Sequence, residues 1–174
     1  MPNGIVIFGA NGCGKTTLGC ELARKLKIKH LDVEDYYFEE SEIPYSKPRS
    51  KDTVIELMLV DIEKCDSFVL SSVKGDYGDK ISSMYKLGVF LSVPIDIRLE
   101  RVKRRSLEQY GERVLVGGDM YEQEQGFLEF VRTRNLSIID EWTKTLACPI
   151  LHLDGTKAIS ENIQLIIEGY NRTK

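Results

Sequence analysis

The chain has 174 residues, a length that suits one domain with its own hydrophobic core. Hydrophobic residues make up 42% of it and charged residues 29%, as in an ordinary soluble globular protein. The net charge of the chain is −3, which does not favour sequence-independent binding of nucleic acid.

Four cysteines are scattered along the chain without a C-x-x-C pair, which is typical of reduced thiols rather than disulfides. The first residues lead straight into an apolar segment and lack the charged and apolar regions of a signal peptide. No apolar run approaches the length of a membrane span. We therefore expect a cytoplasmic protein with no membrane partner.

The first predicted elements surround a glycine-rich loop. An apolar run over residues 4–8 predicts a buried parallel strand, and leucines at helical spacing predict a helix over residues 14–26. The segment between them matches the phosphate-binding pattern G-x-x-x-x-G-K-S/T. Such a loop turns backbone N–H groups toward an anion at the positive end of the following helix. The predicted nucleotide-binding residues are Gly9, Ala10, Asn11, Gly12, Cys13, Gly14, Lys15, Thr16 and Thr17.

A short strand from residue 28 to residue 31 or 32 follows, and acidic side chains come directly after it. Ligands of open α/β sheets bind beyond the carboxyl ends of the strands, so Asp32, Glu34 and Asp35 are candidate site residues. A solvated acidic loop is the alternative for each acid taken singly. We do not expect all three acids to lack a functional role, because loops at this edge of the sheet carry function.

Two loops supply candidate contacts to a second substrate. Residues 39–49 contain two prolines, and residues 74–79 form a polar segment with two glycines at the functional edge of the sheet. The side chains predicted to face a substrate are Tyr45, Lys47, Arg49, Lys74, Asp76 and Tyr77.

A helical pattern covers residues 50–64, with Ser50 and Asp52 as candidate N-caps. Its apolar part, residues 57–63, also has the appearance of a strand that ends in a catalytic acid pair, as in motor-type ATPases. A strand there would leave no crossover helix before the next strand, and parallel neighbours need one. We therefore predict a helix.

A basic helix is predicted over residues 95–108. Arg98, Arg101 and Arg105 recur at i+3 and i+7, so one face presents several guanidinium groups. A solvated basic face is the alternative reading. The glycine-punctuated run over residues 110–120 is typical of a mobile lid.

The rest of the chain continues the alternation of strands and helices. Five apolar strands separated by helices indicate an α/β domain of three layers with a parallel sheet. The remaining predicted elements are a strand over 67–73, a helix over 81–87, a strand over 89–93, a helical region over 121–146 broken near residue 136, a strand over 149–154 and a helix over 158–169.

Together these elements resemble the P-loop small-molecule kinases of the adenylate kinase-like, shikimate kinase-like and uridine kinase-like types. The segment Asp35-Tyr36-Tyr37 is similar to the Asp-x-Phe-Tyr segment of uridine and nicotinamide riboside kinases, whose acid acts on the substrate hydroxyl. The arginine helix resembles the lid helix of these families, which implies a lid over about residues 98–120. Gly155 and Thr156 lie in a segment similar to the loop that borders the adenine base.

The resemblance implies a P-loop NTPase fold with sheet order 2-3-1-4-5 in a single domain over residues 1–174. One departure concerns the acceptor. Adenylate kinase-type enzymes carry Asp-Gly-Phe-Pro-Arg after the third strand, and this chain has Val73-Lys74-Gly75-Asp76-Tyr77-Gly78 there. That difference argues against AMP as the acceptor.

Phosphoryl transfer needs positioning and charge neutralisation, and the chain supplies candidates for each part. Lys15 and the loop amides hold the phosphates of ATP, and the Thr16 hydroxyl ligates Mg²⁺. Asp32 supports the metal through water, and Asp76 competes for this role. Asp35 accepts a hydrogen bond from the acceptor hydroxyl, while Arg101 and Arg105 close over the transferring group.

The predicted function is that of an ATP-dependent kinase of a small metabolite, nucleoside or nucleotide, working as a monomer or homodimer. The alternatives are an ATPase that drives a partner and a nucleotide-binding regulatory module without turnover. Phosphorylation of nucleic-acid ends is a further alternative, against which the net acidity counts mildly. His30 and His152 are interpreted as structural.

Overall fold

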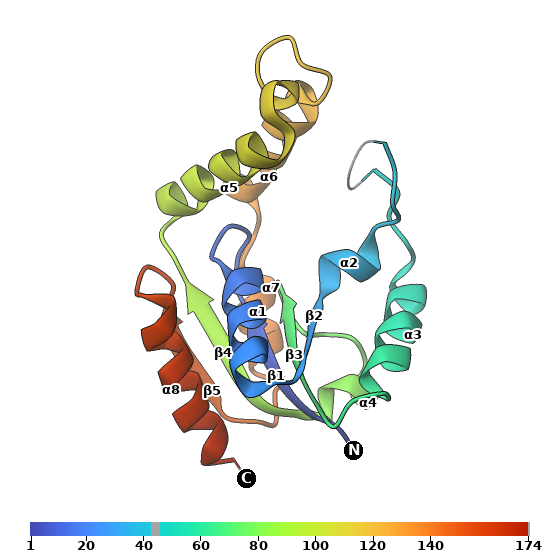
Figure 1. Cartoon of the computed structure of the whole chain (residues 1–174), viewed down its shortest axis with the longest axis vertical. Coiled ribbons are helices and arrows are strands. Elements are labelled where there is room, and N and C mark those ends of the chain that lie inside the picture. The colour runs from blue at the N-terminus through green and yellow to red at the C-terminus, as the bar shows by residue number, and fades with distance from the viewer. Residues whose placement is uncertain (43–45, 174) are drawn as a thin grey trace.

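Residues 1–42 and 46–173 are described by the computed structural model of this chain, so the predicted substrate contact Tyr45 lies outside the described residues. Within these residues, five strands form one parallel sheet in the order β2-β3-β1-β4-β5 (Figure 1). This order confirms the one that the resemblance implies. The strands are β1 (Asn3–Phe8), β2 (Lys29–Asp32), β3 (Ser67–Ser72), β4 (Tyr85–Ser92) and β5 (Ile150–Asp154).

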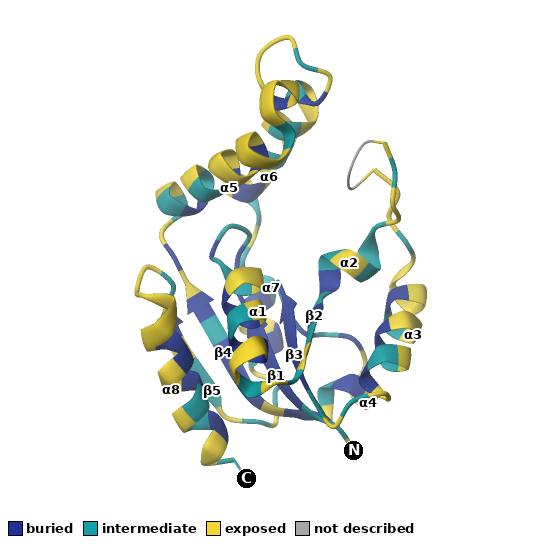
Figure 2. Cartoon of the chain, viewed as in Figure 1, coloured by how far each residue is buried: buried dark blue, intermediate teal, exposed yellow. Residues whose placement is uncertain are grey.

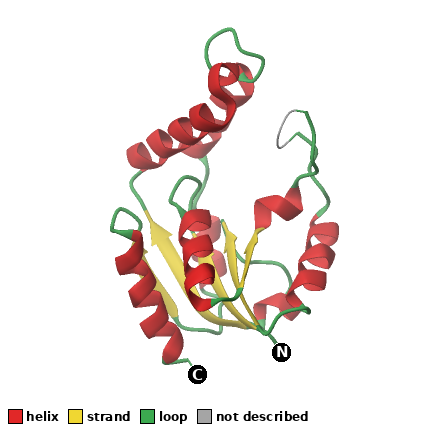
Figure 3. Cartoon of the chain, viewed as in Figure 1, coloured by secondary structure: helices red, strands yellow, loops and turns green. Residues whose placement is uncertain are grey.

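Helices cover both faces of the sheet, which gives the predicted three layers (Figure 3). The break predicted near residue 136 is confirmed, because it separates α6 from α7. The helices in the described ranges are α1 (Lys15–Leu26), α2 (Val33–Tyr37), α3 (Lys51–Ile62), α4 (Asp79–Ser82), α5 (Ile95–Tyr110), the 3₁₀ turn η1 (Gly111–Val114), α6 (Tyr121–Thr133), α7 (Ser137–Thr143) and α8 (Ile159–Asn171).

The central strand β1 shows why the sheet is covered on both sides. Ile5 and Ile7 belong to a core cluster shared with α1 and α8. Val6 and Phe8 point the other way, into a cluster shared with α3 and α7. All four side chains are 0% exposed, and Figure 2 shows the buried strands between helices whose outer faces are exposed. An uninterrupted apolar strand is stable only in such a doubly covered position.

The prediction of a helix over residues 81–87 is wrong. The helix α4 ends at Ser82, and β4 begins at Tyr85, four residues earlier than the sequence predicts. Tyr85 and Leu87 are buried while Lys86 between them is exposed, which is the alternation of a strand. Pairing with β1 from Gly4 onward favours the extended conformation over the short helical pattern.

The helices α5 and α6 pack against each other and extend beyond the sheet (Figure 1). At their far end η1 and the following turn are closed by an ion pair between Arg113 and Asp119, whose shortest N–O distance is 2.8 Å. The residues predicted to form a lid, 98–120, occupy most of α5, η1 and this turn.

The helix α3 is capped at its N-terminus by Ser50. Ser50 Oγ accepts a hydrogen bond from the backbone N–H of Thr53 at 3.2 Å, as predicted from the sequence. We expect Ser50→Ala to lower the free energy of unfolding by about 1 kcal/mol, because one N–H at the helix start loses its partner. Urea denaturation measures this loss. Ser50→Asp is the control, since its carboxylate can accept the same bond, and an equal loss in both variants would contradict the capping role.

Candidate functional site

The glycine-rich loop connects β1 to α1 at the carboxyl edge of the sheet (Figure 1). Gly12 and Gly14 have φ angles of 81° and 95°, a region that disfavours side chains. A Cβ atom on Gly12 would also lie 2.6 Å from the carbonyl oxygen of Arg98. Gly14 is the residue before α1, so the unpaired N–H groups of the first helical turn open into the loop. Lys15 Nζ lies inside the same loop and donates to the carbonyl oxygen of Ala10 at 2.9 Å.

A first cavity of about 430 Å³ lies over this loop. Its wall contains the loop from Asn11 onward, the carboxyl ends of β2 and β3, and arginines of α5. The predicted residues that line it are Asn11, Gly12, Cys13, Gly14, Lys15, Thr16, Thr17, Asp32, Glu34, Arg101, Arg105 and Gly155. The structure therefore brings together the loop, the metal-binding candidates and the arginines that the sequence places far apart.

Two arginines of α5 hold the loop in place. Arg101 donates to the carbonyl oxygens of Cys13 at 3.3 Å and Gly155 at 3.0 Å, and so joins the loop to the segment after β5. Arg98 is buried and donates to the carbonyl oxygen of Asn11 at 3.2 Å. Arg105 is exposed instead, and no hydrogen bond or ion pair occupies its side chain within the described ranges.

The acids after β2 lie on a short helix. Asp32 accepts a hydrogen bond from the backbone N–H of Glu34 at 3.0 Å and so begins α2. Glu34 lines both the first cavity and a second, neighbouring cavity, whereas the exposed Asp35 lines neither. Burial and the nearby Asp32 carboxylate raise the pKa of Glu34 above the usual carboxyl range, and Arg105 and Lys15 oppose this shift. Asp35, the predicted partner of an acceptor hydroxyl, is thus separated from the cavities by its neighbour.

The second cavity, of about 720 Å³, lies between the end of α2 and the helices α5 and α6. Its wall is mostly apolar and rich in aromatic rings. Asn11, Glu34 and Arg105 are shared with the first cavity, so the two cavities adjoin beside the phosphate loop. The aromatic residues of its wall are Tyr37, Phe38, Tyr77, Tyr110, Phe127 and Phe130.

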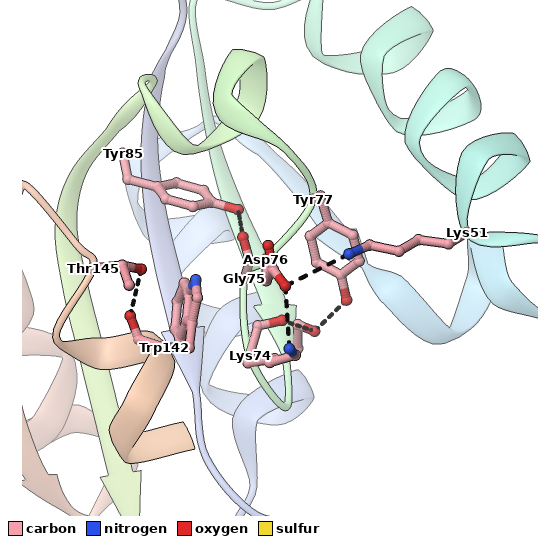
Figure 4. A network of polar contacts seen from close by, with 9 residues as sticks. Lys51, Lys74, Gly75, Asp76, Tyr77, Tyr85, Trp142 and Thr145 are labelled. Atoms are coloured by element: carbon pink, nitrogen blue, oxygen red, sulfur yellow. Dashed lines mark hydrogen bonds and ion pairs between the residues drawn. The ribbon is translucent and has the colours of Figure 1, made fainter. Parts of the chain in front are cut away.

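The loop after β3 forms the floor of the second cavity and is held by polar contacts (Figure 4). Asp76 lies 3.1 Å from Lys74 Nζ and 3.5 Å from Lys51 Nζ, and the hydrogen bond from Lys74 lowers the pKa of this carboxyl. Tyr85 donates its hydroxyl to the carbonyl oxygen of Gly75 at 2.9 Å. Tyr77 is buried with its hydroxyl 2.6 Å from Ser72 Oγ. Lys74, Asp76 and Tyr77, the predicted substrate contacts of this loop, line the cavity, but their polar groups are largely bonded to one another and to the loop.

Other predicted residues lie outside both cavities. Arg49 donates to the carbonyl oxygens of Tyr36 at 2.9 Å and Phe38 at 2.8 Å, which fixes the segment after α2. Thr156 bonds to Asp154 through its hydroxyl and backbone N–H and does not reach the first cavity. Gly9 and Ala10 also line neither cavity. Gly9 donates its backbone N–H to the carbonyl oxygen of Val73 at 3.2 Å, and the carbonyl oxygen of Ala10 accepts the bond from Lys15.

Several lining residues are not singled out by the sequence, among them Arg134, Tyr110 and Glu124. Arg134 lies at the break between α6 and α7 and donates to Asn11 Oδ1 at 2.8 Å, with its guanidinium 5.1 Å from the centre of the Phe130 ring. Tyr110 and Glu124 line the second cavity from α5 and α6. Arginine at a helix break is a weak signal, and nothing in the local pattern marks the other two.

The two side chains predicted to hold Mg²⁺ belong to the wall of the first cavity. These two residues, Thr16 and Asp32, offer one hydroxyl and one carboxylate. No group of three or more His, Cys, Asp or Glu side chains able to hold a metal is found in the part of the chain that the structure describes. Mg²⁺ commonly takes only one or two protein ligands and completes its shell with water and phosphate oxygens.

Among the described residues, no helix has the length and apolarity needed to cross a membrane.

Comparison with known proteins identifies a relative over nearly the whole length of the chain. Uncharacterized protein YqaC of Bacillus subtilis (strain 168) is 32% identical over 176 residues, which cover 97% of each protein. A mouse protein described as probable gluconokinase is 34% identical over 89 residues, 45% of this chain and 48% of that protein. No protein-family model matches the chain.

Solved structures of kinases share the fold. A gluconokinase from Sinorhizobium meliloti 1021 superposes with a TM-score of 0.56 and 16% identity over 98% of this chain and 93% of that one. A deoxyadenosine kinase from M. mycoides, with the products dCMP and dCDP bound, superposes with a TM-score of 0.54 and 16% identity over 97% of this chain and 99% of that one. The chain therefore belongs to the same family as YqaC of Bacillus subtilis and has the fold of the P-loop small-molecule kinases.

Proposed function

We propose that this chain is an ATP-dependent kinase that transfers a phosphoryl group to a small molecule bound in the second cavity. One observation carries the proposal: the two cavities share Asn11, Glu34 and Arg105 in their walls, beside the phosphate loop. A nucleotide over the loop and an acceptor in the second cavity would meet at these residues. Bringing two substrates together in a charge-neutralising site is the main contribution of a protein to phosphoryl transfer.

The first cavity is the proposed site of ATP. The loop amides and Lys15 bind its β- and γ-phosphates, since both present N–H donors to the same anion. Thr16 and Asp32, the latter through water, hold Mg²⁺, which neutralises phosphate charge when it is bound. Arg101 donates to the carbonyl oxygen of Gly155 at 3.0 Å, and the resemblance places the segment of Gly155 beside the adenine base, so we place both residues near the nucleoside end of ATP. Segment 98–120 acts as the lid of a single domain.

A carboxylate is proposed to accept the proton of the acceptor hydroxyl. The resemblance assigns this role to Asp35, but its exposed position outside both cavities favours Glu34. Glu34 lies where the cavities meet, near Arg105. Burial raises the pKa of both Glu34 and Asp35, so the position of Glu34 and not its basicity favours it as the base. Lys74, Asp76 and Tyr77 are proposed to shape the acceptor site, with Arg49 supporting it from behind.

Glu34→Gln and Asp35→Asn separate the two assignments. We expect Glu34→Gln to lower kcat by roughly 10²–10⁴-fold, the usual contribution of a general base, and Asp35→Asn to change it only slightly. The base works in its ionised form, so kcat/KM of the parent protein falls as the pH drops through the raised pKa of Glu34. This acidic limb is absent from the residual activity of Glu34→Gln. The reverse order of effects would assign the role to Asp35.

The function itself is tested by ADP formation with a panel of small hydroxyl- and phosphate-bearing molecules. A kinase shows ATP consumption that rises strongly with one class of acceptor, and the phosphorylated acceptor is detected by mass spectrometry. Fast ATP hydrolysis that no acceptor stimulates would instead indicate an ATPase. Tight ADP binding with no turnover on the whole panel would indicate a regulatory module.

A further inference from the structure

The second cavity contains two polar atoms that the proposed mechanism does not use. Tyr110 Oη and Glu124 Oε1 are buried, and neither has a hydrogen-bond partner among the residues that the structure describes. Both residues line the cavity. Burying a carboxylate oxygen or a hydroxyl without a partner is costly, and native proteins show only a few such groups. Because both side chains belong to the wall of the cavity, we take a bound molecule as the source of the missing partners.

From these atoms and their surroundings we propose that the second cavity binds the nitrogen heterocycle of a nucleoside, free or as its monophosphate. This inference rests on the proposed function, because it names the acceptor of that kinase. Glu124 and Tyr110 would bind the edge of the heterocycle, and its sugar would reach the junction of the two cavities.

The chemistry of the two atoms points to a ligand with N–H groups. An ionised carboxylate accepts hydrogen bonds and donates none, so Glu124 needs a donor, whereas the Tyr110 hydroxyl can take either part. The amino and imino edge of a nucleobase offers donors and acceptors side by side. A sugar acid brings a carboxylate of its own, which Glu124 would repel.

The shape of the cavity favours a flat aromatic ring. Tyr37 and Phe38 follow from α2 on one side, and Phe127 and Phe130 line the cavity from α6 on the other. The rings of Phe127 and Phe130 lie with their centres 6.3 Å apart and only 25° from parallel. Aromatic walls gain from stacking on a π system and gain little from a polyol chain.

The position of the polar atoms sets the orientation of the ligand. Glu124 and Tyr110 line only the second cavity, whereas Glu34 and Arg105 line both cavities. A molecule whose ring reaches Glu124 and whose hydroxyl or phosphate reaches Glu34 and Arg105 is a heterocycle joined to a sugar.

The experiment measures binding separately from turnover. The common ribo- and deoxyribonucleosides, their monophosphates and gluconate are titrated into the full chain by calorimetry, and the same compounds are offered with ATP in the ADP assay. We expect at least one nucleoside or nucleoside monophosphate to bind and to be phosphorylated, and the comparison of the two arms identifies which form is the acceptor. Gluconate is expected to give no heat.

Two conservative variants locate the ring. Glu124→Gln is expected to weaken binding about tenfold, because a charged hydrogen-bond acceptor is lost, and Tyr110→Phe several-fold. Glu122→Gln, an exposed change on the same helix, is the control and should bind as the parent does. If the three variants bind the nucleoside equally, Glu124 and Tyr110 do not hold the ring and the inference is overturned.

The outcomes also separate the inference from the function on which it rests. Absence of binding by every nucleoside and monophosphate overturns the inference, even if another acceptor such as gluconate supports rapid ADP formation and so upholds the kinase. Nucleoside binding that is sensitive to Glu124→Gln but yields no phosphorylated product supports the ring site and contradicts the kinase activity.

Discussion

Replacing Lys15 with methionine is expected to lower ATP-dependent turnover by roughly 10³-fold, near the upper end for the loss of one electrostatic group in an active site. The ammonium group is the one lysine charge inside the loop, where it lies 2.9 Å from the carbonyl oxygen of Ala10. Methionine keeps most of the length of the stem and removes the charge. The charge on the phosphates is hardest to stabilise in the transition state of the transfer. The loss of the ammonium group therefore lowers kcat more than it lowers the affinity for the nucleotide.

Lys25→Met provides the matched control, because Lys25 is an exposed lysine in the last turn of the same helix. It should leave kcat, KM and thermal stability close to those of the parent protein. Steady-state kinetics with ATP and titration with a fluorescent nucleotide analogue separate chemistry from binding. Equal turnover in the parent and Lys15→Met would refute both the phosphate-binding role of the loop and the kinase.

The phosphate loop was predictable because its information is local. A buried strand, a glycine turn and a helix follow one another within residues 3–26, and each residue of the motif has its reason in the conformation of the backbone itself. Gly9 and Gly14, the two fixed glycines of the pattern, have φ angles of 148° and 95°, which side chains disfavour. The order of the strands in the sheet could not be predicted in this way. The resemblance to the P-loop kinases implies it, whereas the spacing of the strands along the chain does not determine it.

The different positions of the three acids after β2 could not be predicted from the local sequence. The sequence presents Asp32, Glu34 and Asp35 as one acidic segment, and only the helix that begins at Asp32 distinguishes them. Successive residues of a helix point in different directions, so Glu34 faces the cavities and Asp35 faces outward. A five-residue helix leaves too short a pattern for hydrophobic periodicity to reveal this phase.

The walls of the second cavity could not be predicted for another reason. The bond between Arg134 and Asn11 joins residues 123 positions apart, and it depends on how the hairpin of α5 and α6 returns to the sheet. Tyr110 and Glu124 look like ordinary amphipathic-helix residues in the sequence. Their importance comes from a cavity that exists only when α2 and the hairpin are placed opposite each other.

Arg105 is the second residue for which we expect a large effect. Arg105→Ala should lower kcat by roughly 10²–10³-fold with a smaller change in KM for ATP. The side chain lines both cavities and carries no hydrogen bond or ion pair within the described ranges, so its guanidinium is free to meet the transferring phosphoryl group. An interaction made mainly in the transition state affects kcat rather than substrate binding.

Arg104→Ala is the control for this charge. Arg104 neighbours Arg105 on the same helix and lines the first cavity, but it lies 3.8 Å from Glu108 and does not reach the second cavity. A mere effect of net positive charge near ATP would lower activity similarly in both variants and would raise KM for ATP in each. A loss confined to Arg105→Ala and to kcat places the guanidinium at the point of transfer. Arg105→Lys should recover only part of the rate, because an ammonium group keeps the charge but cannot bind two phosphate oxygens in the planar manner of arginine.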